Sequence, residues 1–143
     1  MKEHAPRETT LRVLLIGYGN PARCDDGLGP ALARRIEALK LCGVTVDANY
    51  QLTVEDSWTV AQHDIVVFAD SAIEGATPFF CEPLNPAAEI SFSSHSVRPA
   101  VVLAMAESLF NRTVPGYILG IRGYRFDRFE QQLSEEAERN LER

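Results

Sequence analysis

LLIGYGNPARCDDGLGP, residues 14–30, is the stretch around which the rest of the chain is organised. Its apolar start predicts a strand, and Gly17 and Gly19 predict a sharp turn after it, because glycine tolerates positive φ and close backbone approach. The acidic residues Asp25 and Asp26 follow, and the next residues, ALARRIEALK, favour a helix. Turns of this kind lie at the carboxyl edge of an open α/β sheet, where ligands bind. The acidic loop is therefore predicted to form one wall of a functional site.

The rest of the chain continues this alternation. Strands are predicted at residues 11–17, 44–48, 65–70, 78–84 and 115–124, and helices at residues 27–41, 54–62, 98–110 and from 134 onward. Continuous apolar character in residues 65–70 is typical of a strand buried on both faces of a parallel sheet. Pro78 and Pro83 place their strand at the edge of the sheet. We therefore predict an α/β fold, a three-layer α/β/α sandwich with a twisted, mostly parallel five-stranded sheet.

Composition limits the class of protein. The 143 residues, 45% of them hydrophobic, suit a single domain over residues 1–143, with residues 1–10 as a flexible tail. No apolar run approaches the ~20 residues of a membrane-spanning helix. The polar start lacks the apolar core of a signal peptide, so we expect a cytoplasmic protein without a membrane partner. The net charge of -6 disfavours nucleic acid as a partner.

Four single residues have plain structural interpretations. Trp58 and Cys42 are expected in the core, and Ser134 is expected to cap the last helix. Cys24 is interpreted as a small residue in a tight loop rather than a catalytic thiol, because the two aspartates after it would raise the pKa of the thiol.

Three polar side chains follow apolar elements at places that converge in such a sheet. Asp26 follows the first strand, Asp70 ends the third, and His95 lies in the loop before the third helix. Two carboxylates and one imidazole form a three-ligand metal set with open coordination positions, which Lewis-acid catalysis requires. Taken singly, each aspartate is equally consistent with a helix cap, and the histidine with a solvated loop residue.

Three motifs in order make the chain resemble a known family. GYGNPARCDDGLGP, then FADSA after an apolar strand, then SSHSVRP before a helix are similar to the motifs of hydrogenase maturation endopeptidases. The resemblance runs from the first strand to the last. It implies a twisted sheet between helices, and an enzyme that removes a short C-terminal extension from the nickel–iron hydrogenase large-subunit precursor once nickel is in place.

The resemblance also implies roles for individual residues. The family's three metal-contacting positions correspond to Asp26, Asp70 and His95, and the two aspartates are the expected catalytic groups. The residues expected to support the site are Gly17, Gly19, Asn20 and Asp25, the last by stabilising the loop or the start of the helix. The nickel is expected to come from the precursor, with no organic cofactor, and we expect the chain to be a monomer.

Two features depart from the family's usual pattern. Asp26 stands where many members have glutamate, and its shorter side chain reaches less far. Residues 47–53 lack the DGG-type turn of many members. Because this loop is expected to flank the site, its sequence bears on the choice of substrate more than on the type of reaction.

Other classes of protein fit the sequence less well. Peptidyl-tRNA hydrolases share the G-x-G-N-P turn, but their catalytic histidine after the turn is missing here. A non-catalytic nucleotide- or metal-binding module is the alternative from another class. Gly17 and Gly19 resemble the dinucleotide fingerprint, but Ala22 replaces its third glycine, and the two aspartates would repel a pyrophosphate. Residues 122–128, RGYRFDR, are interpreted as a strand with its exit loop rather than an RNA-binding patch.

Overall fold

A computed structural model of the chain describes residues 11–86, 97–124, 126 and 133–142. Strands and helices alternate along it. The strands are β1 (Val13–Tyr18), β2 (Val44–Asn49), β3 (Ile65–Ala72), β4 (Phe79–Leu84) and β5 (Gly116–Arg122). The helices are α1 (Leu28–Leu39), α2 (Asp56–Ala61), α3 (Pro99–Phe110) and α4 (Glu135–Glu142), and a 3₁₀ turn, Cys24–Gly27, joins β1 to α1.

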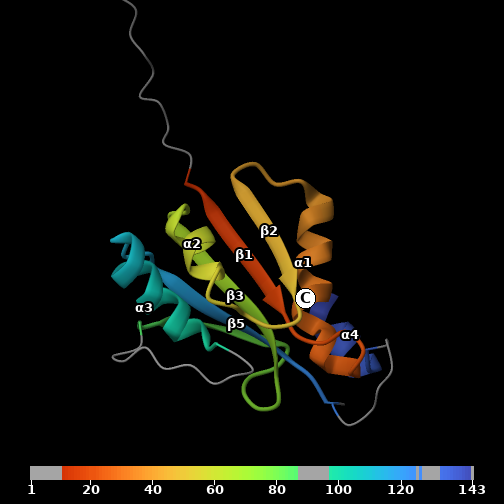
Figure 1. The fold of residues 1–143 in the computed structure, drawn as a ribbon. Coiled ribbons are helices and arrows are strands. Elements are labelled where there is room, and N and C mark those ends of the chain that lie inside the picture. Colours follow the sequence, from red (N-terminus) through yellow and green to blue (C-terminus); the bar gives the residue numbers. More distant parts are fainter. Residues whose placement is uncertain (1–10, 87–96, 125, 127–132, 143) are drawn as a thin grey trace, which may run out of the picture.

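The five strands form one sheet in the order β2-β1-β3-β5-β4. The first four strands in this order are parallel, and β4 pairs with β5 in the antiparallel direction. The predicted edge position of residues 78–84 is confirmed. Parallel neighbours bring the carboxyl ends of β1, β3 and β5 to the same edge of the sheet (Figure 1).

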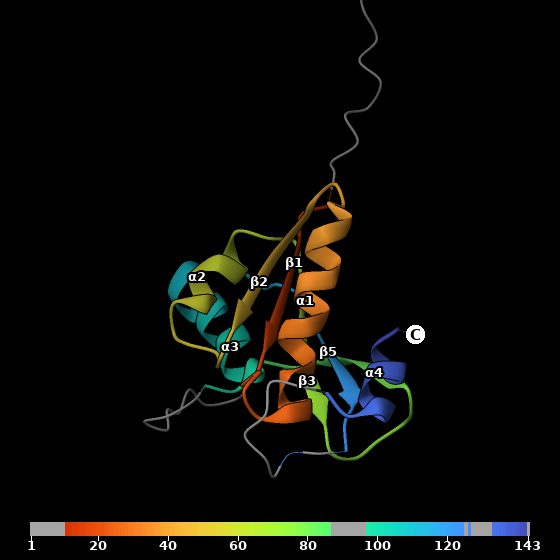
Figure 2. The same ribbon diagram turned by 90° about the vertical axis from the view of Figure 1, so that its right-hand side faces the viewer.

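Helices cover both faces of the sheet, which confirms the predicted three-layer sandwich. Figure 2 shows α2 and α3 on one side of the strands and α1 and α4 on the other. Between the sheet and α2 and α3, a core cluster includes Leu14, Phe68 and Val102. A smaller cluster, which includes Leu28 and Ile121, lies on the side of α1 and α4. None of the helices in the described ranges is both long and apolar enough to cross a membrane.

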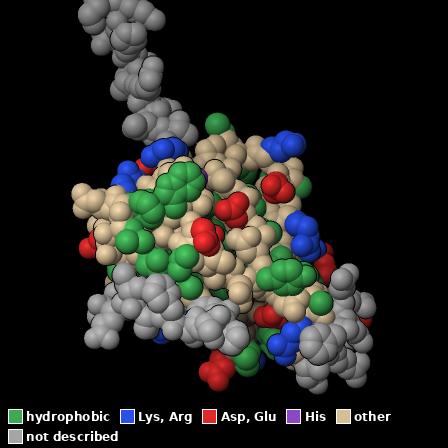
Figure 3. Space-filling model, in the orientation of Figure 1, with side chains coloured by type: hydrophobic (Ala, Val, Ile, Leu, Met, Phe, Trp, Pro, Cys, Tyr) green, Lys and Arg blue, Asp and Glu red, His purple; other side chains and the backbone are tan. Residues whose placement is uncertain are grey.

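Two residues predicted for the core lie at the surface instead. Trp58 is 58% exposed, because the six-residue helix α2 presents one face to the core and that face carries the fully buried Val60. Figure 3 shows hydrophobic side chains gathered over α2 and α3, and the exposed residues there include Trp58 and Leu109. Cys42 is exposed because α1 ends at Leu39, and the left-handed backbone of the next residue, Lys40, turns the chain away from the helix.

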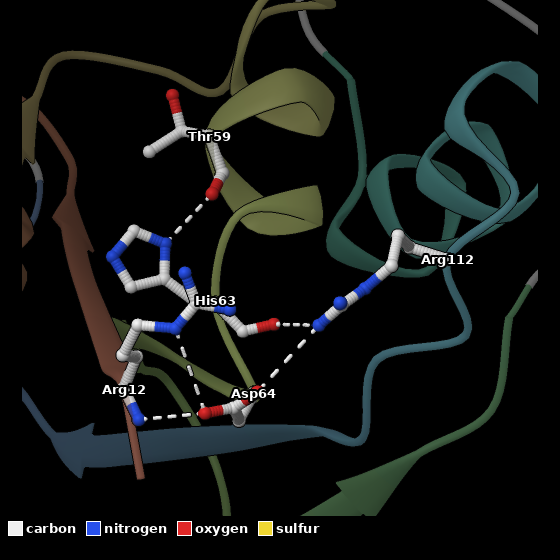
Figure 4. A network of polar contacts seen from close by, with 5 residues as sticks. All are labelled: Arg12, Thr59, His63, Asp64 and Arg112. Carbon is white, nitrogen blue, oxygen red and sulfur yellow. Dashed lines mark hydrogen bonds and ion pairs between the residues drawn. The ribbon is translucent and has the colours of Figure 1, made fainter. Parts of the chain in front are cut away.

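A polar network joins elements at the amino edge of the sheet (Figure 4). Asp64 accepts a hydrogen bond from the backbone N–H of Arg12 at 2.8 Å and lies 3.6 Å from Arg112. His63 contacts the carbonyl of Thr59 through Nδ1 at 2.7 Å, and its own carbonyl accepts a hydrogen bond from Arg112. The Arg12 N–H, followed by the two arginine charges, lowers the pKa of Asp64. Because this network precedes β3, it lies at the opposite end of the strands from Asp70.

Candidate active site

Two glycines allow helix α1 to pack directly against the carboxyl ends of β1 and β3. A side chain at Gly17 would overlap the carbonyl of Gly29 in α1. A side chain at Gly29 would in turn overlap the carbonyls of Tyr18 and Ala69, which belong to the two strands. The site-supporting role expected for Gly17 thus has a physical basis, which is close helix-to-strand packing. Gly29 has the same function, and sequence reasoning did not single it out.

The turn after β1 holds the carboxylate of Asp26. Gly19 has φ +139°, and a side chain there would overlap the carbonyl of Asp26. The N–H of Asn20 donates a hydrogen bond to Asp26 Oδ2 at 2.8 Å. Asn20 Oδ1 accepts a hydrogen bond from the N–H of Ala22 at 2.9 Å, which closes a local turn. Gly19 and Asn20 therefore fix the direction in which the half-buried Asp26 leaves the turn.

Asp70 lies beside this turn, within β3. The strand was expected to end at Asp70 but continues to Ala72, because β5 pairs with it throughout. The N–H of Ser71 donates a hydrogen bond to Asp70 Oδ1 at 2.8 Å. Burial and the nearby charge of Asp26 raise the pKa of Asp70 to about 6, although hydrogen bonds from Ser71 and Tyr18 oppose the shift. The structure thus brings the two predicted catalytic carboxylates together.

Tyr18, the last residue of β1, is a member of this site that sequence reasoning missed. It stands next to Asp70 across the sheet, one step beyond the Gly17–Ala69 pair that joins β1 to β3. Burial, followed by the charges of Asp70 and Asp26, raises the pKa of Tyr18 well above its ordinary value, so the phenol stays protonated as a donor. A tyrosine at the end of an apolar strand carries no local signal of this contact, which depends on β1 and β3 being neighbours.

Asp25 points away from Asp26 into the protein. Its carboxylate is fully buried and accepts hydrogen bonds from the N–H of Tyr124 at 2.6 Å, and from the N–H and hydroxyl of Ser134 at 2.7 Å each. Ser134 also accepts a hydrogen bond from the N–H of Ala137, which confirms its predicted role at the start of the last helix. Asp25 therefore stabilises the loop, as expected, by joining it to two distant segments.

Two further positions named in the sequence analysis are His95 and Cys24. His95 lies outside the described residues, and in the part of the chain that is described no group of three or more His, Cys, Asp or Glu side chains is arranged to hold a metal ion. The three-residue metal set therefore stays a prediction. Cys24 is buried with φ +50° in the 3₁₀ turn, which agrees with its interpretation as a small residue in a tight loop.

The loop after β2 flanks the turn, as its position in the sequence suggested. A hollow of about 160 Å³ lies beside Gly19 and Pro21, and Asn49 and Tyr50 form part of its wall. Arg34 of α1 lines the same hollow. The N–H of Gly19 donates a hydrogen bond to the carbonyl of Asn49 at 3.0 Å, so the end of β2, from which this loop starts, is directly joined to the turn that carries Asp26.

This fold is the one found in hydrogenase maturation proteases. No protein-family model matches the sequence, and no curated protein sequence matches it. Among solved structures, the chain is similar to the NiFe hydrogenase maturation protease HycI from Thermococcus kodakarensis KOD1. The TM-score is 0.68 and the identity 23%, over 94% of this chain and 88% of that one.

Two further solved structures have the same fold. The hydrogenase maturating endopeptidase HybD from E. coli matches with a TM-score of 0.67 and 19% identity, over 92% of this chain and 86% of that one. The hydrogenase 2 maturation peptidase from Thaumarchaeota archaeon SCGC_AB-539-E09 matches with a TM-score of 0.63 and 23% identity, over 92% and 91% of the two chains.

Proposed function

We propose that this chain is an endopeptidase that removes the C-terminal extension of a nickel–iron hydrogenase large-subunit precursor after nickel insertion. The observation that carries the proposal is the convergence of Asp26 and Asp70 at one edge of the sheet. These residues come from two separate motifs, and the fold around them is that of proteins named as hydrogenase maturation proteases.

The nickel is part of the substrate in this proposal. Asp26, Asp70 and His95 contact it, since carboxylate and imidazole groups are suitable ligands for a divalent transition metal. The N–H of Asn20 holds Oδ2 of Asp26, and an ionised carboxylate has about four acceptor sites, so one donor leaves room for a ligand. Nickel at this position would polarise the scissile carbonyl or position a water, while a carboxylate accepts or donates a proton.

The test is processing of the nickel-loaded precursor by purified variants, followed as a shift in size on a gel. Asp26→Ala, Asp70→Ala and His95→Ala are each expected to slow processing severely. Asp64→Ala is the matched control, because Asp64 is a carboxylate at the opposite edge of the sheet and is expected to leave processing unchanged. Circular dichroism of each variant separates loss of the site from loss of the fold. Normal processing by all three site variants would overturn the proposal.

A nucleotide-binding module remains the alternative from another class, and ligand binding distinguishes the two. The acidic 3₁₀ turn directly precedes α1, so negative charge lies where a Rossmann-type module would place a pyrophosphate. We therefore expect thermal stabilisation of the protein by nickel or cadmium and none by nucleotides. Stabilisation by nucleotides alone would favour the binding module.

A further inference from the structure

We propose that Tyr18 is a positioning residue that orients the carboxylate of Asp70 for the processing reaction. The inference rests on the proposed function of Asp70 and adds a residue that the three sequence motifs did not identify.

Strand register places the two side chains next to each other. The last pair that joins β1 to β3 is Gly17 with Ala69, so Tyr18 and Asp70 are the next residues on the two neighbouring strands. Paired residues of adjacent strands present their side chains on the same face of a sheet, and successive residues alternate between faces. Tyr18 and Asp70 therefore leave the sheet on the same face and at the same level (Figure 1 shows the two strands side by side).

Both the ring and the backbone of Tyr18 are held in place by neighbouring elements. It packs against the core cluster between the sheet and helices α2 and α3. Its backbone pairs with Asn49 of β2 on one side, and Gly29 of α1 lies against its carbonyl. A side chain anchored at both its backbone and its ring presents the hydroxyl at a defined point, and Asp70 is its neighbour on β3.

In this proposal the hydroxyl provides the second donor to the Asp70 carboxylate. The first is the N–H of Ser71, which belongs to the backbone and reaches Oδ1. One donor leaves a carboxylate free to turn about its last bond, whereas two donors from separate elements define its plane. An ionised carboxylate has about four acceptor sites, so two donors leave room for a ligand. The charge of Asp26 acts on both Tyr18 and Asp70. With its plane fixed, the Asp70 carboxylate would direct its remaining acceptor sites towards the substrate rather than towards Asp26.

The deciding experiment compares Tyr18→Phe with the wild-type protein in steady-state processing of the nickel-loaded precursor. Phenylalanine keeps the ring in the core and removes only the donor. We expect kcat to fall about 10- to 100-fold, the range for the loss of one hydrogen bond to a charged group, while KM changes little. The melting temperature is expected to stay within a few degrees of the wild-type value, because the apolar packing is retained.

Two further variants make the result specific. Tyr117→Phe is the matched control, because Tyr117 is a half-buried tyrosine of the neighbouring strand β5 whose loss of a hydroxyl is expected to leave kcat unchanged. Replacement of Tyr18 by 4-aminophenylalanine restores a donor at the same end of the ring, and it is expected to recover most of the lost rate even if Tyr18→Phe is less stable.

The outcomes separate this inference from the proposed function. Wild-type kcat in Tyr18→Phe would overturn the positioning role while leaving the processing activity established. A raised KM with unchanged kcat, or no recovery with the amino analogue, would also overturn it. Failure of the wild-type protein to process any precursor would reject the proposed function and the positioning role together.

Discussion

The buried carboxylate of Asp25 offers the sharpest test of how the site turn is held. Asp25→Ala removes the acceptor for three donors, which are the N–H groups of Tyr124 and Ser134 and the hydroxyl of Ser134. A buried donor without its partner costs about 1–3 kcal/mol, and three would sum to about 3–9 kcal/mol if none found another acceptor. The hydroxyl can rotate and water can enter the space left by the side chain, so we expect a loss of about 3–5 kcal/mol.

That loss is a large part of the total, since a domain of this size has about 5–15 kcal/mol of stability. Urea denaturation followed by circular dichroism measures it as a shift of the midpoint. Asp26→Ala is the matched control, because the neighbouring carboxylate is half-buried and accepts one hydrogen bond, from Asn20, so about 1 kcal/mol is expected. Ser134→Ala, which removes a helix cap, should fall between them at about 1–2 kcal/mol. A loss for Asp25→Ala no greater than that for Asp26→Ala would mean that the buried Asp25 carboxylate does not hold the turn.

Three other predictions concern packing and surface charge. Gly17→Ala is expected to destabilise the fold by at least about 3 kcal/mol, measured in urea, because its new methyl group meets the carbonyl of Gly29 rather than a side chain that can move. Trp58→Ala should cost no more than about 1 kcal/mol in the same assay, whereas Phe68→Ala should cost about 3–5 kcal/mol, since only Phe68 is fully buried. In an acid titration at low salt, ionised Asp64 is expected to stabilise the folded protein above pH 3.8, its ordinary pKa, and to lose this contribution as the pH falls through its lowered pKa in the folded state. Asp64→Asn should remove this dependence of the free energy of unfolding on pH, and high salt should weaken it.

Local sequence signals were enough to predict the sheet, its edge strand and the placement of Asp26 and Asp70 at one edge of it, whereas the catalytic role of the two carboxylates stays a prediction. Apolar runs and glycine turns are properties of short segments. In a parallel sheet the carboxyl ends of all strands lie at the same edge, whatever the order of the strands across the sheet. For this reason Asp26 and Asp70 could be paired without knowing the order of the strands. The same signals failed for Trp58, because a large apolar residue on a short helix is buried only if it faces the sheet. His95 lies outside the described residues, and its role stays a prediction.

The position of the turn at Gly19, and of Asp26 after it at the carboxyl edge of the sheet, can be predicted from the order of residues along the chain. The groups that surround these residues depend on how distant segments pack together. Tyr18 lies beside Asp70 because β1 and β3 are neighbours in the sheet, and the buried Asp25 finds a partner in Ser134, 109 residues away. The physical reason is that backbone preferences act between residues close in the chain, whereas the donors that orient a buried carboxylate come from whichever segments the packing of the core brings against it.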